Sequence, residues 1–226
     1  MDVEYAVRTI SLTKDFGALR AVDRINLKVE RGSFYGFLGP NGAGKSTTIK
    51  ILTGLMGPTF GSARLLGLDL VHDSLNIKKK IGVVPEDLCL FENLTPREYL
   101  IFIARMYRIP KNVYQSRCDE LLSLLDLDDC GKKLVLELSH GMKKKLSLAA
   151  AILHDPELLF LDEPFEGVDA IASRTIRNVL QRLIQRGATI FLTSHVLEIV
   201  ERLCTHVGII SDGVLVKQAS MDEFAG

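Results

Sequence analysis

The sequence lacks the features that tie a chain to nucleic acid, to a secretory route or to the interior of a membrane. Its 28 lysine and arginine residues balance 28 aspartate and glutamate residues, whereas a protein that binds nucleic acid through its overall charge is expected to be basic. The N-terminal stretch "MDVEYAVRTI" has no basic region and no apolar region, so no secretory signal is predicted. The longest apolar stretches fall far short of a bilayer span, which predicts a soluble chain that reaches a membrane only through a partner.

The sequence also lacks any C-x-x-C pair, low-complexity linker or internal repeat. Its four cysteines, Cys89, Cys118, Cys130 and Cys204, are therefore expected to be buried thiols in a reducing compartment. The chain has 226 residues, of which 47% are apolar and 25% charged, enough for one large domain or for a domain with a subdomain. Because it ends soon after its last predicted strand and helix, no further C-terminal domain is expected.

The hydrophobic pattern predicts strands and helices in alternation around a long helical block. Apolar and polar residues alternate over residues 7–38, as in strands, and a first helix is predicted over 45–55. Residues 86–154 are nearly all helical in pattern, with the clearest start at Thr95, followed by Pro96 and by Glu98 of a capping box. Further strands are predicted at 62–67, 81–85, 158–162, 188–194 and 206–210, further helices at 170–186 and 196–204, and an Asp-Gly hairpin within 211–214. This order predicts an α/β sheet core with a helical insertion.

The stretch "FLGPNGAGKST" has the pattern of a phosphate-binding loop, G-x-x-x-x-G-K-S, at Gly39, Gly44, Lys45 and Ser46. Small residues allow backbone N–H groups to wrap a phosphate, and the following helix adds the positive end of its dipole. Lys45 is expected to neutralise the outer phosphates and to assist catalysis, and the Ser46 hydroxyl to ligate Mg²⁺. The remaining members of the loop expected to bind the nucleotide are Asn41, Gly42, Ala43 and Thr47. The alternative is a glycine-rich turn before an ordinary helix.

An apolar strand, "LLFLD", ends in a pair of carboxylates. Asp162, at the end of the strand, is placed to hold Mg²⁺, and Glu163 is placed to take a proton from an attacking water. The alternative is a polar strand terminus before a turn at Pro164. A nearby phosphate-binding loop favours the first interpretation, because a Mg²⁺-nucleotide needs such a carboxylate.

A third stretch, "LSHGM", follows the phosphate-binding loop and precedes the carboxylate pair. With these three motifs, the chain resembles the ATP-binding cassette (ABC) ATPases, and the resemblance covers nearly its whole length. Their signature, Leu-Ser-Gly-Gly-Gln, corresponds here to residues 138–142, and His140 and Met142 depart from its commonest residues. The resemblance implies that Ser139 and Gly141 contact the γ-phosphate of ATP bound to another cassette. A serine N-cap on an amphipathic helix is the plainer interpretation, and both can hold together. The Ser-x-Gly-Met-Lys form resembles a large exporter class whose membrane subunits are separate six-span chains.

The resemblance also implies a fold and a domain division. The fold is a P-loop NTPase of the α/β class: a RecA-like core with a mixed sheet, an N-terminal antiparallel β subdomain and an inserted helical subdomain. Residues 1–226 then form a single nucleotide-binding domain. Residues 1–85 and 155–226 form its core and β subdomain, and residues from about 86 to 154 form its helical subdomain.

Three further positions match residues of the family one by one. Phe16 corresponds to the aromatic side chain that stacks on adenine, although a core phenylalanine is the alternative. Asp169, in "GVD", corresponds to the acidic residue of a loop that crosses the dimer interface. His195 follows an apolar strand in "LTSH" and corresponds to the histidine that touches the γ-phosphate, whereas a lone histidine is more often structural.

Glu86 is the most consequential departure, since the family usually has glutamine there. Glutamate can still ligate Mg²⁺, but when ionised it cannot donate a hydrogen bond. It also adds a third carboxylate near Asp162 and Glu163, and like charges at short range raise a carboxyl pKa. We therefore expect Glu86 to make the site more dependent on Mg²⁺. An exposed loop glutamate away from the metal is the alternative.

Two surface features have simpler interpretations. The lysine runs at 78–80 and 143–145 are expected to be solvated faces that hold no ligand. Family members receive a short helix of the membrane subunit over residues 86–108, where the side chains of Leu90, Phe91, Phe102 and Tyr107 are either part of that surface or part of the core.

The sequence thus predicts an ATPase subunit of an ABC transporter, with export favoured over import and with ATP and Mg²⁺ as cofactors. Two copies, or one copy and a paralogous subunit, are expected to close around two ATP molecules and drive a permease from the cytoplasmic face of the membrane, without nucleic acid. One alternative is a soluble ABC ATPase acting on ribosomes or DNA, but such chains carry a second cassette or long coiled coils. The other alternative is a small-molecule kinase or a GTPase. The guanine-binding sequence Asn-Lys-x-Asp of a GTPase is not present.

Overall fold

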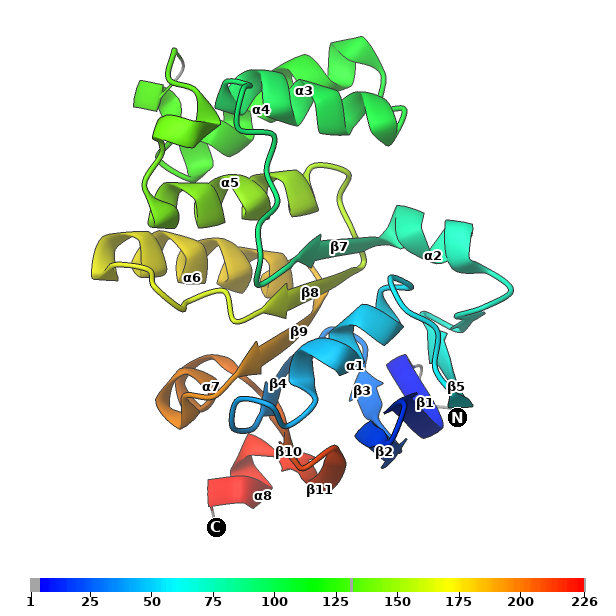
Figure 1. Cartoon of the computed structure of the whole chain (residues 1–226). Helices are drawn as coiled ribbons and strands as arrows, with labels where there is room; N and C mark the ends of the chain where they lie inside the picture. Colours follow the sequence, from blue (N-terminus) through cyan, green and yellow to red (C-terminus); the bar gives the residue numbers. More distant parts are fainter. Residues whose placement is uncertain (1–4, 131, 226) are drawn as a thin grey trace.

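A six-stranded mixed sheet forms the centre of the computed structural model, which describes residues 5–130 and 132–225 (Figure 1). Its strands lie in the order β11-β10-β4-β9-β8-β7. Their bounds are β4 (Phe34–Leu38), β7 (Ile81–Val84), β8 (Leu158–Asp162), β9 (Thr189–Ser194), β10 (His206–Ser211) and β11 (Val214–Ser220). Neighbours from β10 to β7 run parallel, and β11 pairs antiparallel with β10. The predicted mixed sheet is confirmed.

A second sheet, entirely antiparallel, is built from the N-terminal part of the chain. It contains β1 (Tyr5–Phe16), β2 (Leu19–Ile25), β3 (Lys28–Glu30), β5 (Phe60–Leu65) and β6 (Leu68–Asp69). The long strand β1 pairs with β2, β3 and β5, and β6 pairs with β5. This sheet is the antiparallel N-terminal part that the resemblance implied.

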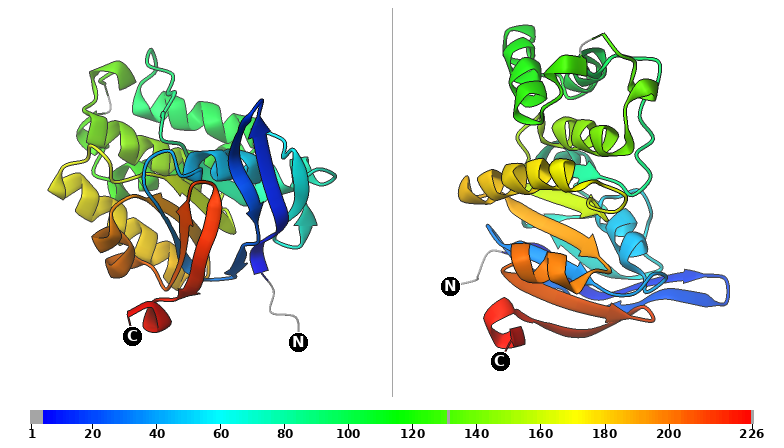
Figure 2. Two further views of the ribbon diagram at one scale, coloured as in Figure 1. Left: turned by 60° about the horizontal axis from the view of Figure 1, so that its bottom comes forward. Right: turned by 90° about the vertical axis from the view of Figure 1, so that its left-hand side faces the viewer.

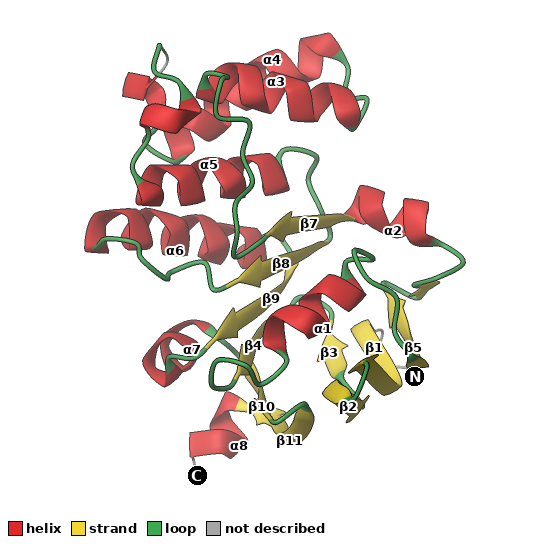
Figure 3. Ribbon diagram, viewed as in Figure 1, coloured by secondary structure: helices red, strands yellow, loops and turns green. Residues whose placement is uncertain are grey.

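The helices form layers against the central sheet (Figures 2 and 3). They are α1 (Lys45–Leu52), α2 (Ser74–Lys80), α3 (Pro96–Met106), α4 (Lys111–Leu124), α5 (His140–Ile152), α6 (Ala170–Gln185), α7 (Leu197–Leu203) and α8 (Met221–Ala225), with 3-10 turns η1 (Asp128–Cys130) and η2 (Val135–Glu137). In Figure 1, α5 and α6 lie between the sheet and the outer helices α3 and α4. Over the described residues, no helix combines the length and the apolar character that a membrane span requires.

Alternate side chains of each central strand enter two different hydrophobic cores. Along β8, Leu158 and Phe160 pack with α1 and the antiparallel sheet, whereas Leu159 and Leu161 pack with α5, α6 and the outer helices. This is the two-residue period of a strand that is covered on both faces. The carboxyl ends of the parallel strands are thereby fixed between two packed layers, where polar residues can be held rigidly.

Local sequence signals set several element boundaries as predicted. The Thr95 hydroxyl accepts a hydrogen bond from the Glu98 backbone N–H, and the Glu98 carboxylate accepts one from the Thr95 backbone N–H, which completes the capping box at α3. Asp212 and Gly213 both have positive φ angles, 48° and 78°, in the tight turn between β10 and β11. Both predictions are confirmed.

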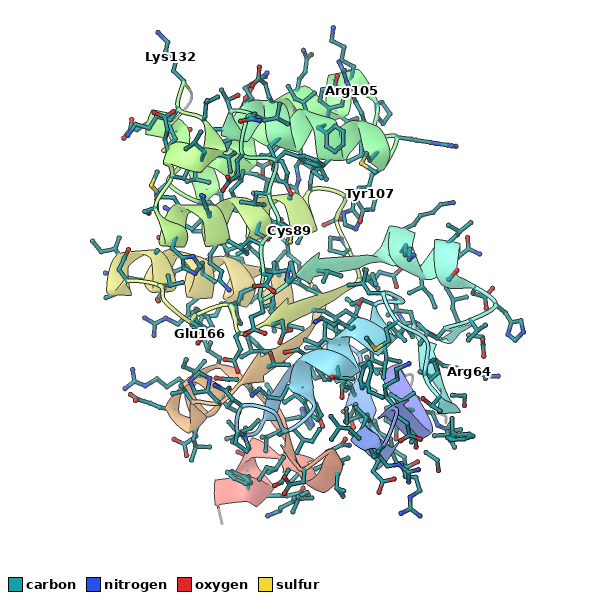
Figure 4. The ribbon with its side chains drawn as sticks, viewed as in Figure 1. Arg64, Cys89, Arg105, Tyr107, Lys132 and Glu166 are labelled. Carbon is teal, nitrogen blue, oxygen red and sulfur yellow. The ribbon has the colours of Figure 1, made fainter. Side chains whose placement is uncertain are left out.

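Three predictions are wrong in part. Residues 86–95 and 131–139 contain no α-helix among the described residues, because the chain there crosses between subdomains and caps the helices that follow. The first helix ends at Leu52 rather than at 55, since Gly54 adopts a left-handed φ of 70° that stops it. Cys118, Cys130 and Cys204 are buried thiols, but Cys89 is exposed in the loop that follows β7 (Figure 4). Residues 1–4, 131 and 226 of the expected single domain lie outside the described residues.

Candidate nucleotide site

The phosphate-binding loop joins β4 to α1 and is wrapped too tightly for side chains at two of its glycines. A Cβ at Gly39 would lie 2.3 Å from the Ile210 carbonyl oxygen, and one at Gly44 would lie 2.5 Å from the Ala21 carbonyl oxygen. Gly44 also has a φ of +102°, which L side chains rarely adopt. The loop therefore brings its N–H groups and the N-terminus of α1 to one cavity of about 450 Å³. Its lining is Phe16, Leu19, Ala21, Asn41, Gly42, Gly44, Lys45, Ser46, Thr47, Glu86 and Glu163.

Lys45 is buried at the floor of this loop, with 5% of its surface exposed. Its ammonium donates hydrogen bonds to the carbonyl oxygens of Gly39 at 2.8 Å and Pro40 at 3.1 Å. It also forms an ion pair with Glu163, with 3.3 Å between Nζ and Oε1. A buried charge needs such partners, and these hold the cation beside the loop's N–H groups.

Three oxygen atoms from three segments converge at Ser46. Its hydroxyl oxygen lies 3.2 Å from Oδ1 of Asp162 and 3.3 Å from Oε2 of Glu86. Glu86 is exposed, yet it lies at this centre rather than away from it. No cluster of three His, Cys, Asp or Glu side chains suited to a metal occurs in the described part of the chain. The carboxylates of Asp162 and Glu86 and the hydroxyl of Ser46 nevertheless fit Mg²⁺, because this ion takes few protein oxygens and completes its shell with phosphate and water.

Glu163 is held in an unusual backbone conformation at the end of β8. Its φ is +44°, a region that costs a residue other than glycine about 1–3 kcal/mol. The Glu163 backbone N–H donates to the Thr193 hydroxyl at 3.0 Å, and that hydroxyl donates to Oδ1 of Asp162 at 2.6 Å. Nδ1 of His195 lies 3.1 Å from Oε2 of Glu163. Hydrogen bonds thus join Asp162, Glu163 and Thr193 at the ends of β8 and β9, and the His195 ring lies against this centre.

Sequence reasoning missed Thr193. Its hydroxyl holds both carboxylate residues, but a threonine within an apolar strand gives no signal by itself. The signal lies in the pairing of β8 with β9, where Asp162 and Thr193 occupy partner positions. A polar residue two positions before His195 would have stood out once that pairing was known.

The expectation that residues 143–145 form a solvated face is wrong for two of the three lysines. Lys143 is the accessible one and pairs with Glu92. Lys144 is only 3% exposed, and its ammonium donates to the carbonyl oxygens of Glu163 at 3.1 Å and Glu86 at 3.5 Å. Lys145 is also buried and donates to a backbone carbonyl at 3.1 Å. Burial lowers the pKa of Lys144, and four nearby carboxylates oppose that shift. The run at 78–80 is exposed throughout, as expected.

Ser139, Gly141 and Asp169 form a second group, at the N-termini of α5 and α6. The Ser139 hydroxyl accepts from the Met142 N–H at 3.3 Å, so this serine is the N-cap of α5, and it is exposed. Asp169 caps α6 by accepting from two backbone N–H groups at 2.9 Å. A Cβ at Gly141 would lie 3.2 Å from Cβ of Ala172, so the two helix ends approach closely. None of the three residues lines the cavity at the phosphate-binding loop.

These motifs and this fold are matched by known proteins. A family model described as "ABC transporter" matches residues 22–166, more than half of the chain. The chain belongs to the ABC transporter family. A second model, described as "AAA domain, putative AbiEii toxin, Type IV TA system", matches the shorter stretch 133–201. The chain is an ATP-binding and ATP-hydrolysing cassette of the transporter type.

Individual relatives are similar over almost the whole chain. "Bacitracin transport ATP-binding protein BcrA" of Bacillus licheniformis is 42% identical, over 96% of this chain and 70% of the relative. "Daunorubicin resistance ATP-binding protein DrrA3" of Streptomyces coeruleorubidus is 34% identical, over 96% of this chain and 69% of the relative. A solved "Structure of ATP binding subunit of ABC transporter" has a TM-score of 0.89 and 30% identity, and covers 96% of this chain and 91% of that one.

Phe16 lies at the mouth of the nucleotide cavity of this cassette rather than in a core. Its side chain is 45% exposed and lines the cavity together with Leu19 and the loop residues. The Lys14 ammonium lies 5.3 Å from the centre of the ring. The alternative of a core phenylalanine is therefore wrong, and the ring is available for stacking.

A groove separates the central sheet of the cassette from the outer helices. It has a volume of about 320 Å³ and is lined mainly by apolar residues, including Pro85, Leu88, Ile103 and Tyr107. Figure 4 shows Tyr107 at the far end of α3. Three of the four aromatic or apolar residues in question are surface rather than core: Phe91, Phe102 and Tyr107 are 54%, 38% and 39% exposed. Leu90 packs partly against the helical core.

Proposed function

We propose that this cassette works as a dimer that closes around two Mg-ATP molecules and drives a separate membrane permease. One observation carries the proposal: the residues of the site fall into two groups that do not meet within one chain. The phosphate-binding loop has its own cavity, whereas Ser139 and Gly141 form an exposed helix N-terminus outside it. An exposed helix N-terminus with a free approach for an anion suits a phosphate supplied by a second copy or by a paralogous subunit.

The first group accounts for nucleotide binding. The ring of Phe16 is offered to adenine, and the N–H groups of residues 41–47 surround the phosphates. Ser46, Asp162 and Glu86 supply the oxygen ligands that would hold Mg²⁺ beside them. When bound, the ion supplies positive charge against the charge that develops on the phosphates.

The same group accounts for hydrolysis. The Glu163 carboxylate is the proposed base that takes a proton from the attacking water, and it is fixed from both sides by Lys45 and His195. His195 is half-exposed beside the cavity and is placed to hold the γ-phosphate as well. Lys45 stabilises the charge on the outer phosphates in the transition state.

The permease is proposed to dock in the groove between the sheet and the outer helices. This groove is apolar, and Phe91 and Phe102 beside it form an exposed edge-to-face pair with ring centres 5.0 Å apart. A short amphipathic helix of a membrane subunit would bury these surfaces and press on the loop that carries Glu86. The relatives named for bacitracin transport and daunorubicin resistance favour export. The cassette would then act at the cytoplasmic face of the cell membrane.

The test is the solution mass of Glu163→Gln with Mg-ATP, with Mg-ADP and with no nucleotide. Blocking hydrolysis should trap the ATP-bound state, so a dimer with Mg-ATP alone is expected. Glu166→Gln is the matched control, because Glu166 is an exposed carboxylate three residues further on (Figure 4). This control should hydrolyse ATP and accumulate no dimer.

A monomer under all three conditions would first be tested for a weakened signature, by restoring His140→Gly and Met142→Gln together. Dimerisation of that variant would keep the proposed arrangement and assign the weakness to those two residues. A monomer that still binds Mg-ATP would contradict the dimer. Loss of ATP hydrolysis by Glu163→Gln but not by Glu166→Gln would separately establish the proposed base.

A further inference from the structure

The buried Lys144 holds the main chain of two residues of the ATP site although it belongs to the helix of the signature. Its ammonium reaches the carbonyl oxygen of Glu163 at 3.1 Å and that of Glu86 at 3.5 Å. Neither contact involves the side chain that performs chemistry. Lys144 therefore acts on the position of Glu163 and of the loop at Glu86, not on a substrate.

Glu163 needs such support because its left-handed backbone conformation is unfavourable for a glutamate. The Thr193 hydroxyl holds its N–H, while Lys144 and the N–H of Glu166, at 3.2 Å, hold its carbonyl oxygen. Unfavourable backbone conformations persist only where surrounding contacts enforce them. Of these three groups, the Thr193 hydroxyl, the Lys144 ammonium and the Glu166 N–H, only the ammonium of Lys144 belongs to α5.

Helix α5 begins at its N-cap Ser139, five residues before Lys144. Five residues of α-helix rise about 7.5 Å, so the exposed end of α5 and the Lys144 backbone belong to one rigid segment. In the proposed dimer, that exposed end contacts ATP held by the partner. A displacement of α5 by the partner's nucleotide would reach Glu163 of its own chain through the Lys144 ammonium.

We propose that Lys144 is a positioning residue that couples the signature end of α5 to the catalytic carboxylate of the same chain. The inference rests on the proposed function, because it needs the partner's ATP at Ser139. It adds a defined mechanical link between the two ATP sites of the dimer.

The first test compares Lys144→Met with the wild type in the full chain. Methionine fills much of the space of the lysine stem but has no donor at its end. We expect kcat to fall about tenfold or more, because small misplacements of a catalytic group are costly, with the Kd for Mg-ATP within about twofold of wild type. Lys144→Arg keeps donors and should recover part of the rate. Lys143→Met is the matched control, since Lys143 is the accessible neighbour, and its rate should be unchanged.

A second readout does not depend on activity. Deuterium uptake of the segment 163–168 should rise in Lys144→Met and stay at the wild-type level in Lys143→Met, because the Glu163 carbonyl loses one of its two donors. Unchanged uptake and a kcat within twofold of wild type would overturn the proposal. A fall in kcat matched by an equal loss of nucleotide affinity would also overturn it, since Lys144 would then be merely structural.

A double-mutant cycle with Ser139→Gly tests the coupling itself. If both residues act through α5, the rate losses of Ser139→Gly and Lys144→Met should combine to less than their product. The rate losses of Ser139→Gly and Lys143→Met should simply multiply. If the losses of Ser139→Gly and Lys144→Met also multiply, the coupling is overturned. Failure of the proposed function is a separate result: Glu163→Gln would then show no Mg-ATP-dependent dimer, whatever the Lys144 variants do.

Discussion

The two groups of functional residues differ in how completely one chain builds them. In the group at the phosphate-binding loop, Lys45, Ser46, Asp162 and Glu163 are linked by contacts of 3.3 Å or less and are mostly buried. In the group at α5 and α6, the side-chain hydrogen bonds of Ser139 and Asp169 go to the first turns of their own helices, and both residues are exposed. A polar group that satisfies its own helix and faces solvent remains available to a ligand from outside.

In the proposed dimer, this difference would let one chain bind a nucleotide without being a complete enzyme. Rigid, mutually hydrogen-bonded groups suit the part of a site that must bind ATP in every state. Exposed helix ends suit the part that engages only when two chains close. Substitutions in the two groups should therefore have different consequences for affinity and for turnover.

The largest effect is expected in the first group, for nucleotide affinity. Lys45→Met should weaken Mg-ATP binding about 10- to 100-fold, because a charge-assisted hydrogen bond contributes about 1.5–3 kcal/mol. Isothermal titration of the monomer measures this. Lys50→Met is the control on the same helix, since Lys50 is exposed and lies outside the cavity lining. Equal affinity of Lys45→Met and wild type would contradict the assigned role.

A smaller effect, and on turnover alone, is expected in the second group. Ser139→Gly removes the hydroxyl but preserves most of the helix cap, since glycine costs only a few tenths of a kcal/mol there. Its kcat should fall about tenfold, while Mg-ATP affinity of the monomer stays at the wild-type value. A loss of monomer affinity would show that the two groups act within one chain and would remove the distinction between them.

A still smaller effect is expected at Glu86, on the dependence of the first group on Mg²⁺. Glu86→Gln should retain a larger fraction of its maximal activity at limiting Mg²⁺. The shift of the midpoint should be about two- to fivefold, because charge interactions at an exposed carboxylate are worth up to about 1 kcal/mol. Asp87→Asn, the exposed neighbour, is the control and should titrate like wild type. Superimposable curves for Glu86→Gln and wild type would reject the idea.

The first group was largely predictable because its motifs are local. Six consecutive residues specify the wrap of the phosphate-binding loop, and an apolar strand followed by Asp162 specifies the edge at which the carboxylate lies. The placement of Ser46 against Asp162 then follows from parallel strands, whose carboxyl ends share one edge. The capping box at Thr95 was predictable for the same reason, since all of its partners lie within four residues.

Residues whose environment is set by distant segments were not predictable. Residues 143–145 are all lysines, yet only Lys143 is accessible. Lys144 and Lys145 are buried because their ammonium groups donate to the carbonyl oxygens of Glu163 and Asp126, which lie elsewhere in the chain. Thr193 was missed for the same reason. The path of residues 86–95 also escaped prediction, because tertiary contacts decide it: Leu88 lines the groove, Leu90 and Leu94 pack partly against the helical core, and Phe91 is exposed.

The smallest effect is expected at His154, which lies outside both groups and should make the stability of the fold depend on pH. The residue follows α5, its Nε2–H donates to the Ile81 carbonyl at the start of β7, and its ring stacks on Tyr107. Its other nitrogen, Nδ1, is buried and has no hydrogen-bond partner among the described residues. Burial therefore lowers the pKa of His154, an effect that the Ile81 contact and Asp155 only partly offset.

The sign of the resulting pH dependence follows from proton binding. As the pH falls through about 6.5, the unfolded chain takes up a proton on His154 that the folded chain does not, so this residue contributes a loss of stability below that pH. His154→Gln can still donate to Ile81 but does not titrate. From pH 7.5 to 5.5 its melting temperature should therefore fall less than that of wild type, by about 2 °C. A wild-type decline no steeper than that of His154→Gln would show that protonation of this residue does not destabilise the fold.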